Sequence, residues 1–229
     1  MTGTDTRSRE RDRSTRPGKG WRQRSRSLRV WAALLALTVS SGLLISAFVM
    51  QPFLIPSGSM ESTLHPGDRI LVNKLAYRFG GDVRRGDVVV FDGRGTFTAA
   101  QPDGSPLREA GAAVGLADPG ETDYVKRVIG VGGDRVTCCD GQGRLHVNGV
   151  PLDERYLFPG DAPSTVAFDI EVPAGRLWLM GDHRSDSADS RDHLGGPGGG
   201  TVAVDKVIGR AEWIGWPASR WGSVRAGHG

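Results

Sequence analysis

Cysteine and histidine are scarce in this sequence, and neither occurs in a pattern that binds metal. The 229 residues include two cysteines and five histidines. The spacings Cys-x-x-Cys and His-Glu-x-x-His, which are typical of redox or zinc sites and of zinc peptidases, are both absent. We therefore expect no metal site and no cofactor.

The two cysteines, Cys138 and Cys139, are adjacent. Outside the cytoplasm a pair of cysteines suggests a disulfide bond. Neighbouring residues on a strand point to opposite faces, however, and a bridge between them departs from ordinary disulfide geometry. A bridge, two free thiols and contacts with another chain all remain open.

An excess of positive charge is missing from most of the chain, although the formal net charge is +3. Residues 1–29 carry ten Arg and Lys against three Asp and Glu, whereas residues 30–229 carry 19 against 23. The folded part therefore lacks the basic surface that attracts nucleic acid, and we expect no nucleic-acid partner. The basic tail, poor in aliphatic residues, is predicted to be disordered and to contact anionic lipid or signal topology.

Charge is absent altogether from residues 30–50, a run of 21 mostly apolar residues. A helix of this length spans roughly 30 Å, the thickness of a bilayer core. A cleavable signal peptide would have a shorter apolar region and a buried core helix would be amphipathic, so we predict a retained transmembrane helix. Arginines precede the run and none follows until Arg69, which predicts a single pass through the cell membrane with a cytoplasmic N-terminus and an extracytoplasmic remainder.

Helical periodicity and internal repeats are lacking elsewhere. Short β-branched runs between turn residues predict a mainly β fold with an antiparallel sheet. The predicted organisation is a disordered basic tail over 1–29, a transmembrane helix over 30–50, an extracytoplasmic β domain over 51–229 and a smaller β insertion over 135–180. Within this domain, residues 69–74 and 87–91 are predicted to pair as strands, residues 135–139 and 144–147 to form a hairpin, and residues 92–121 to form a long surface loop.

The sequence also lacks Gly-x-Ser-x-Gly, the turn that presents the nucleophile of many Ser-His-Asp hydrolases. Instead, Ile55-Pro56-Ser57-Gly58-Ser59-Met60 follows the apolar run, and its Pro and Gly predict an exposed bend that presents two hydroxyls. A second segment, Tyr124-Val125-Lys126-Arg127-Val128-Ile129-Gly130, places Lys126 in an apolar strand pattern, where burial would lower the pKa of its amine. Taken alone, Lys126 is better interpreted as an ordinary surface lysine on an edge strand.

A third segment is Gly181-Asp182-His183-Arg184-Ser185-Asp186-Ser187-Ala188-Asp189-Ser190-Arg191. In order and in kind, the three segments resemble those of the type I signal peptidases, the Ser/Lys proteases of bacterial membranes. The resemblance covers roughly residues 30–216. It implies the following roles: Ser59 as nucleophile, Lys126 as general base, Ser57 and the Ser59 N–H as the oxyanion hole, Ser187 as the residue that orients the lysine amine, and Asp182, Asp189 and Arg191 as structural support.

This chain departs from the family's motifs at several positions. Families of this type usually show Gly-Asp-Asn-Arg-Asp-Asn-Ser, where this chain has His183, Ser185 and Asp186 at the variable places, and Gly132 stands where a proline is common. These differences put the loop geometry in question and leave Ser59, Lys126 and Ser187 intact. We interpret His183 as a solvated loop histidine and not as a triad base.

The resemblance implies a membrane-anchored serine endopeptidase that cleaves signal peptides from exported preproteins after Ala-x-Ala-like sites. The substrate would bind extended against residues 51–56 and 123–126. Self-cleavage at Thr98-Ala99-Ala100 is a further hypothesis. A surface that dips into the membrane interface is predicted from Phe53, Leu54, Trp213, Trp216 and Trp221, with core packing as the alternative for each Trp. The alternative function is a membrane-anchored β domain that binds partners without catalysis, and the sequence does not indicate an oligomeric state.

Overall fold

A computed structural model describes residues 20–98 and 122–224, apart from the side chains of residues 20–26 and 45–48. The chain divides into two compact units, residues 1–42 and 43–229, and each is described by itself. Of the hypothetical self-cleavage sequence, Ala99 and Ala100 lie outside the described residues, as do residues 1–19 of the predicted tail.

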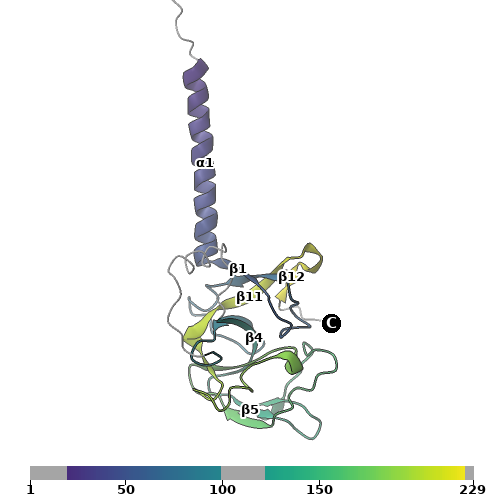
Figure 1. Cartoon of the computed structure of the whole chain (residues 1–229). Helices are drawn as coiled ribbons and strands as arrows, with labels where there is room; N and C mark the ends of the chain where they lie inside the picture. Colours follow the sequence, from purple (N-terminus) through teal and green to yellow (C-terminus); the bar gives the residue numbers. More distant parts are fainter. Residues whose placement is uncertain (1–19, 99–121, 225–229) are drawn as a thin grey trace, which may run out of the picture. The chain divides into compact units, whose positions relative to one another are not determined.

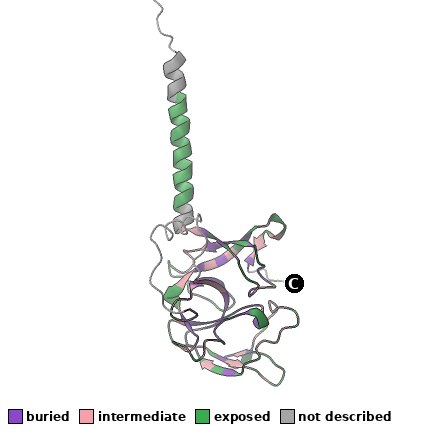
Figure 2. Ribbon diagram, viewed as in Figure 1, coloured by how far each residue is buried: buried purple, intermediate pink, exposed green. Residues whose placement is uncertain are grey.

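Helix α1 extends from Gly20 to Phe48. Its window Ser27–Leu44 has a mean hydropathy of 1.5 and is long and apolar enough to cross a membrane, and its side chains are exposed (Figure 2). The helix begins ten residues before the predicted span and ends two residues before the predicted end. Extension into the arginine-rich segment is favourable because an existing helix gains one hydrogen bond per added residue and arginine has a high helix propensity.

Eight strands form a large antiparallel sheet in the order β1-β2-β11-β3-β4-β9-β10, with β12 paired to β11 (Figure 1). The strands are β1 (Met50–Leu54), β2 (Arg69–Asn73), β3 (Val88–Asp92), β4 (Asp123–Val131), β9 (Arg176–Met180), β10 (Val202–Ala203), β11 (Val207–Trp216) and β12 (Gly222–Ser223). The predicted mainly β, antiparallel fold is therefore confirmed.

Strand β11 separates β2 from β3. Both strands pair antiparallel with β11, so the prediction that residues 69–74 and 87–91 pair with each other is wrong. The alternation of apolar residues specifies which face of a strand is buried, but it does not specify which strand lies beside it. Strand β11, which comes from the C-terminal part of the domain, completes the sheet between β2 and β3.

A second sheet has the order β7-β6-β5-β8 and lies at the opposite end of the domain from β1 and β12 (Figure 1). Its strands are β5 (Arg135–Cys138), β6 (His146–Val147), β7 (Val150–Pro151) and β8 (Phe168–Glu171). The predicted hairpin is confirmed by the antiparallel pairing of β5 with β6. Strand β9 pairs with β4, so the segment predicted as an insertion over 135–180 contributes its last strand to the large sheet. Cys138 and Cys139 form a disulfide bond.

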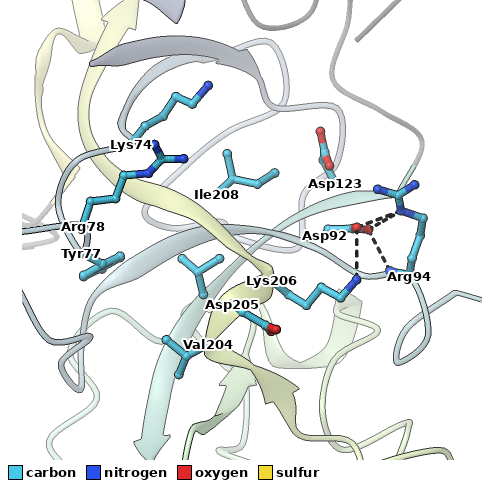
Figure 3. Close-up of a pocket in the computed structure, with 11 residues that line it drawn as sticks. Lys74, Tyr77, Arg78, Asp92, Arg94, Asp123, Val204, Asp205, Lys206 and Ile208 are labelled. Atoms are coloured by element: carbon cyan, nitrogen blue, oxygen red, sulfur yellow. Dashed lines mark hydrogen bonds and ion pairs between the residues drawn. The ribbon is translucent and has the colours of Figure 1, made fainter. Parts of the chain in front are cut away.

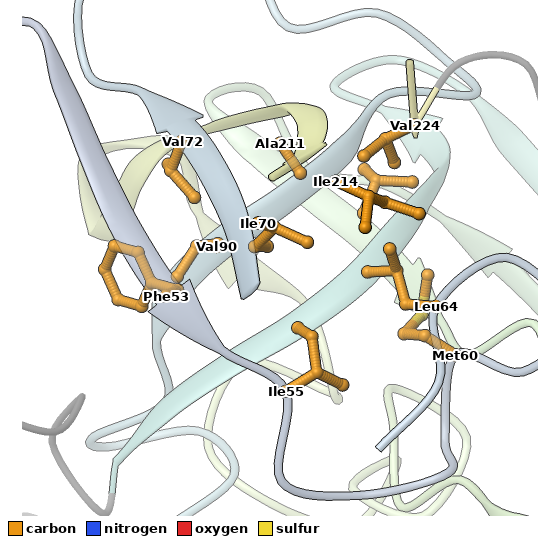
Figure 4. Packing of buried hydrophobic residues seen from close by; sticks show 11 residues of the cluster. Phe53, Ile55, Met60, Leu64, Ile70, Val72, Val90, Ala211, Ile214 and Val224 are labelled. Atoms are coloured by element: carbon orange, nitrogen blue, oxygen red, sulfur yellow. The ribbon is translucent and has the colours of Figure 1, made fainter. Parts of the chain in front are cut away.

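Within residues 20–98 and 122–224, buried apolar side chains form three clusters, and one of these clusters includes the segment that follows β1. In this cluster Ile55, Met60 and Leu64 pack with side chains of β1, β2 and β11 (Figure 4). Phe53 belongs to the same cluster and is 3% exposed, so the prediction that it joins an interfacial surface is wrong. Alternation along β1 points Phe53 inward and leaves its neighbour Leu54 exposed.

Candidate active site

The loop that carries Ser59 is held in place by apolar side chains on both sides. Ile55 and Met60 are buried, and Ile55 also donates its backbone N–H to the carbonyl of Asp68 at 2.9 Å. Between these anchors the chain bends through Ser57 and Gly58. The loop therefore presents Ser59 from a fixed backbone, which is the arrangement that a nucleophile requires.

Lys126 reaches this loop from β4, 67 residues further along the chain. Its Nζ donates to Ser59 Oγ at 2.6 Å, and the lysine is 3% exposed. On β4, Lys126 is paired in register with the fully buried Val89 of β3. Burial among strands therefore brings the predicted nucleophile and the predicted base into direct contact, and the interpretation of Lys126 as a surface lysine is wrong.

Burial lowers the pKa of the Lys126 amine to about 8. Loss of hydration is the largest cause, because a charged amine is costly to remove from water. The charges of Asp189 and Asp182 act in the opposite direction and raise the pKa, whereas Arg191 lowers it. With a pKa of about 8, roughly one amine in ten is neutral at pH 7, compared with about one in 2,500 at the ordinary value.

Ser57 lies close to Ser59, the predicted nucleophile, as the predicted oxyanion hole requires. Its Oγ is 3.5 Å from Ser59 Oγ, at the outer limit of a hydrogen bond. The Ser57 hydroxyl can rotate about its Cβ–Oγ bond. If Ser59 attacks a substrate carbonyl, this hydroxyl can therefore donate a hydrogen bond to the carbonyl oxygen as it becomes negatively charged. The geometry is compatible with an oxyanion hole made by Ser57 and the Ser59 N–H.

Ser187 makes a different contact from the one that was predicted. Its hydroxyl donates to Asp189 Oδ2 at 2.9 Å, and among the described residues the hydrogen bond of the Lys126 amine goes to Ser59. Ser187 is nonetheless within the site, because a Cβ added at Gly181 would lie 2.3 Å from its Oγ and 2.5 Å from the Ser59 carbonyl oxygen. Gly181 is therefore required for the close approach of the third segment to Ser59.

Asp189 and Arg191 form a buried ion pair beside the amine. The guanidinium of Arg191 donates to both carboxylate oxygens of Asp189, each at 2.8 Å, and also donates to the carbonyl of Arg184 at 2.8 Å. Asp189 is fully buried and also accepts from the N–H of Gly181 at 3.0 Å. This two-pronged geometry fixes the loop that passes next to Lys126.

Asp182 is bound by Arg127, a residue that was not predicted to belong to the site. The Arg127 Nε and Nη2 donate to Asp182 at 2.7 and 2.6 Å, and Nη2 also donates to Thr63 Oγ1 at 3.0 Å. This network joins the segment after Ser59, the strand of Lys126 and the third segment. The sequence did contain a sign of this role. Arg127 lies inside an apolar strand pattern, and a buried arginine needs an acidic or hydrogen-bonding partner.

His183 is not a solvated loop histidine, and that interpretation is wrong. Its side chain is 17% exposed, it stacks on Phe158 with ring centroids 3.9 Å apart, and its Nδ1 lies 3.7 Å from a carboxylate oxygen of Glu61. Its backbone N–H donates to the Ser59 carbonyl at 3.2 Å. His183 therefore contributes to the position of Ser59 through its backbone.

The chain matches known families and proteins. The sequence profile of the family described as "Signal peptidase, peptidase S26" matches residues 28–216. The chain is 42% identical over 226 residues to "Signal peptidase I" of Mycobacterium tuberculosis (strain ATCC 25618 / H37Rv), a match that covers 87% of this chain and 76% of that protein. It is 31% identical over 199 residues to "Signal peptidase I" of Bacillus licheniformis, covering 83% of this chain and 90% of that protein.

A crystal structure of a signal peptidase I from Enterococcus faecalis V583 is also similar, with 21% identity and a TM-score of 0.35 over 56% of this chain and 96% of that one. The family match includes all three segments that the resemblance was based on. As the resemblance predicted, the chain belongs to the signal peptidase family, peptidase S26, and is a hydrolase of peptide bonds.

Proposed function

We propose that this protein is a serine endopeptidase that removes signal peptides from exported preproteins with a Ser59/Lys126 dyad. The observation that carries the proposal is the 2.6 Å contact between a buried amine of lowered pKa and the hydroxyl of Ser59. The substrate class follows from the family and from relatives that are named signal peptidase I.

In the reactive state Lys126 is neutral and accepts the proton of Ser59. The Ser59 oxygen attacks the carbonyl at the scissile bond, and the oxygen of the resulting intermediate is held by the Ser59 N–H and the Ser57 hydroxyl. Lys126 then gives its proton to the leaving amine, which is the new N-terminus of the exported protein. A water molecule, deprotonated by the same amine, hydrolyses the ester on Ser59 and releases the signal peptide.

An extended substrate fits the backbone beside Lys126. Strand β3 pairs with Asp123–Arg127 along one edge of β4, whereas the pairing with β9 along the other edge covers Arg127–Val131. The substrate would lie along the second of these edges, beside residues 123–126, and against residues 51–56. A peptide strand in this position would bring its scissile carbonyl to Ser59. Small side chains at the −1 and −3 positions, as in Ala-x-Ala, suit this close approach.

Attachment to the membrane follows from α1 and from an exposed apolar surface. In register across β1, β2 and β11, Leu54 and Trp216 both lie opposite Arg69, and they are 37% and 58% exposed. Trp213 and Trp221 are 47% and 72% exposed. Exposed tryptophans are typical of the membrane interface, so we infer an anchored enzyme with its catalytic domain outside the cytoplasm.

The test is cleavage of a preprotein by the full-length chain in nonionic detergent. Ser59→Ala should reduce the rate by several orders of magnitude because the nucleophile is gone. Lys126→Arg should do the same, because arginine keeps the charge but does not deprotonate in proteins. Ser62→Ala is the matched control: this exposed hydroxyl, three residues from Ser59, donates to the Tyr156 carbonyl, and its loss should leave the rate unchanged.

Unchanged processing by Ser59→Ala or Lys126→Arg would exclude the dyad. A wild-type chain that binds preprotein tightly but never cleaves it would instead support the alternative of a binding domain without catalysis. Circular dichroism of each variant separates loss of chemistry from loss of folding.

A further inference from the structure

The connection between β7 and β8 lies against the third segment, and the proposed mechanism gives it no role. We call its residues 154–163 the strap. Near one end of the strap, the buried side chains of Glu154 and Arg184 form an ion pair. Near the other end, Asp161 accepts hydrogen bonds from the backbone N–H and the hydroxyl of Ser185, at 3.1 and 2.7 Å. The strap is therefore bound to the third segment on both sides of its middle.

Phe158, in the middle of the strap, contacts the third segment through both its backbone and its ring. Its backbone N–H donates to the carbonyl of Asp182 at 3.0 Å. Its ring stacks on the imidazole of His183, with the ring centroids 3.9 Å apart and 16° between the planes. The imidazole Nδ1 is buried and, among the described residues, has no hydrogen-bond partner; a carboxylate oxygen of Glu61 is 3.7 Å away. The stack on Phe158, and not a hydrogen bond of Nδ1, therefore holds the His183 ring in place.

His183 joins the strap to Ser59 through its backbone. Its N–H donates to the Ser59 carbonyl at 3.2 Å, the upper limit of an ordinary N–H···O hydrogen bond. A hydrogen bond of this length fixes Ser59 only as firmly as His183 itself is fixed. Ser59 Oγ is in turn 2.6 Å from the Lys126 amine, a distance that leaves little tolerance for movement of the Ser59 backbone. The Phe158 ring is therefore two contacts away from the proposed nucleophile.

From this chain of contacts we propose that Phe158 is a positioning residue, which acts through His183 to hold Ser59 in place for proton transfer. This inference rests on the proposed function, because it takes Ser59 as the nucleophile. Without the Phe158 ring, the backbone that carries His183 has room to shift, and a displacement of about 1 Å at a reacting group can cost about 100-fold in rate. The proposed substrate-binding residues, 51–56 and 123–126, belong to other elements, so KM should change little.

The test measures kcat and KM for preprotein cleavage by the full-length chain in nonionic detergent. Phe158→Ala should lower kcat by about 10- to 100-fold and change KM by less than about twofold. Phe158→Tyr keeps a flat ring and should restore kcat to within about twofold of the wild type. His183→Ala removes the other half of the stack and should lower kcat as Phe158→Ala does. The double variant should be no slower than the slower single variant, because residues that act through one contact are not additive.

Tyr77→Ala is the matched control, because it also removes a half-buried aromatic ring, from another part of the domain. Tyr77 lies in the connection between β2 and β3, and its ring centroid is 5.9 Å from the guanidinium carbon of Arg210. It lines a cavity of about 650 Å³ to which neither Ser59 nor Lys126 contributes (Figure 3). Tyr77→Ala should lose stability in urea as Phe158→Ala does, and should keep the wild-type kcat.

A wild-type kcat in Phe158→Ala, an equal loss of kcat in Phe158→Ala and Tyr77→Ala, or an effect on KM alone would overturn the proposal. Losses that multiply in the double variant would also overturn it, because Phe158 would then act independently of His183. If circular dichroism shows that Phe158→Ala does not fold, Phe158→Leu replaces it with the same expected fall in kcat, because leucine keeps most of the apolar volume but has no flat ring. A wild-type chain that does not cleave preprotein would refute the proposed function, whereas cleavage at one rate by the wild type and Phe158→Ala would refute only the positioning role.

Discussion

Replacement of Lys126 by methionine should stabilise the fold while it removes the proposed base. Burial holds the amine at a pKa of about 8, compared with about 10.4 in an unfolded chain. That difference corresponds to about 3 kcal/mol by which protonation of the lysine opposes folding. Methionine fills a similar volume without a charge, and the lost hydrogen bond to Ser59 costs about 1 kcal/mol. At pH 7 we expect a net gain of about 2 kcal/mol in the free energy of unfolding.

The pH dependence of this difference in unfolding free energy shows whether protonation of Lys126 is its cause. Below pH 8 both the folded and the unfolded lysine carry a proton, so the full penalty is present in the wild type. Between pH 8 and about pH 10.4 the folded protein releases this proton while the unfolded chain keeps it, so wild-type stability rises with pH over this window. The advantage of Lys126→Met should therefore shrink by about 3 kcal/mol as the pH rises from 7 to 10.5.

The assay is urea unfolding of both full-length proteins in nonionic detergent, followed by near-ultraviolet circular dichroism at pH 7 and pH 10.5. Other groups that titrate over this range are common to both proteins and cancel in the difference. Lys206→Met is the control, because the Lys206 side chain is 44% exposed and loses little hydration on folding. An advantage of Lys126→Met that is the same at both pH values would refute the argument that burial lowers the pKa of this amine.

Three further predictions concern catalysis and the groups around it. The rate of preprotein cleavage should rise tenfold per pH unit at low pH and level off near pH 8, where the Lys126 amine loses its proton; a flat profile from pH 6 to pH 9 would contradict a lysine base. Gly181→Ala should abolish cleavage, because the new Cβ would lie 2.5 Å from the Ser59 carbonyl oxygen; wild-type kinetics in this variant would show that the loop adjusts freely. Arg191→Leu leaves the buried carboxylate of Asp189 without its counter-charge, so unfolding experiments should find a loss of about 3–5 kcal/mol. In the same variant the midpoint of the pH profile should move above 8, and an unmoved midpoint would argue against electrostatic coupling to the amine.

The sequence predicts the two residues of the proposed dyad better than it predicts the residues and strands that surround them. Ser59 and Lys126 were identified because each lies in a local motif, and the structure brings their side chains into contact. The partner of Arg127 was not predictable, since Asp182 is 55 residues away and an ion pair leaves no local pattern. The position of β11 between β2 and β3 was missed for a similar reason, because strands with the same alternation are interchangeable until the whole sheet is assembled.

Two buried ion pairs near Lys126 bear on how its amine can lose its charge next to carboxylates. Asp182 and Asp189 are fully buried near Lys126, and both favour the charged amine. Each carboxylate is bound in two-pronged fashion by its own arginine, Arg127 or Arg191, and the charge of Arg191 lowers the pKa of the amine. Loss of hydration is the largest effect and lowers the pKa of Lys126. Arg191 therefore does more than fix a loop: its charge lowers the pKa of the Lys126 amine and so favours the neutral form, which in the proposed mechanism takes the proton of Ser59.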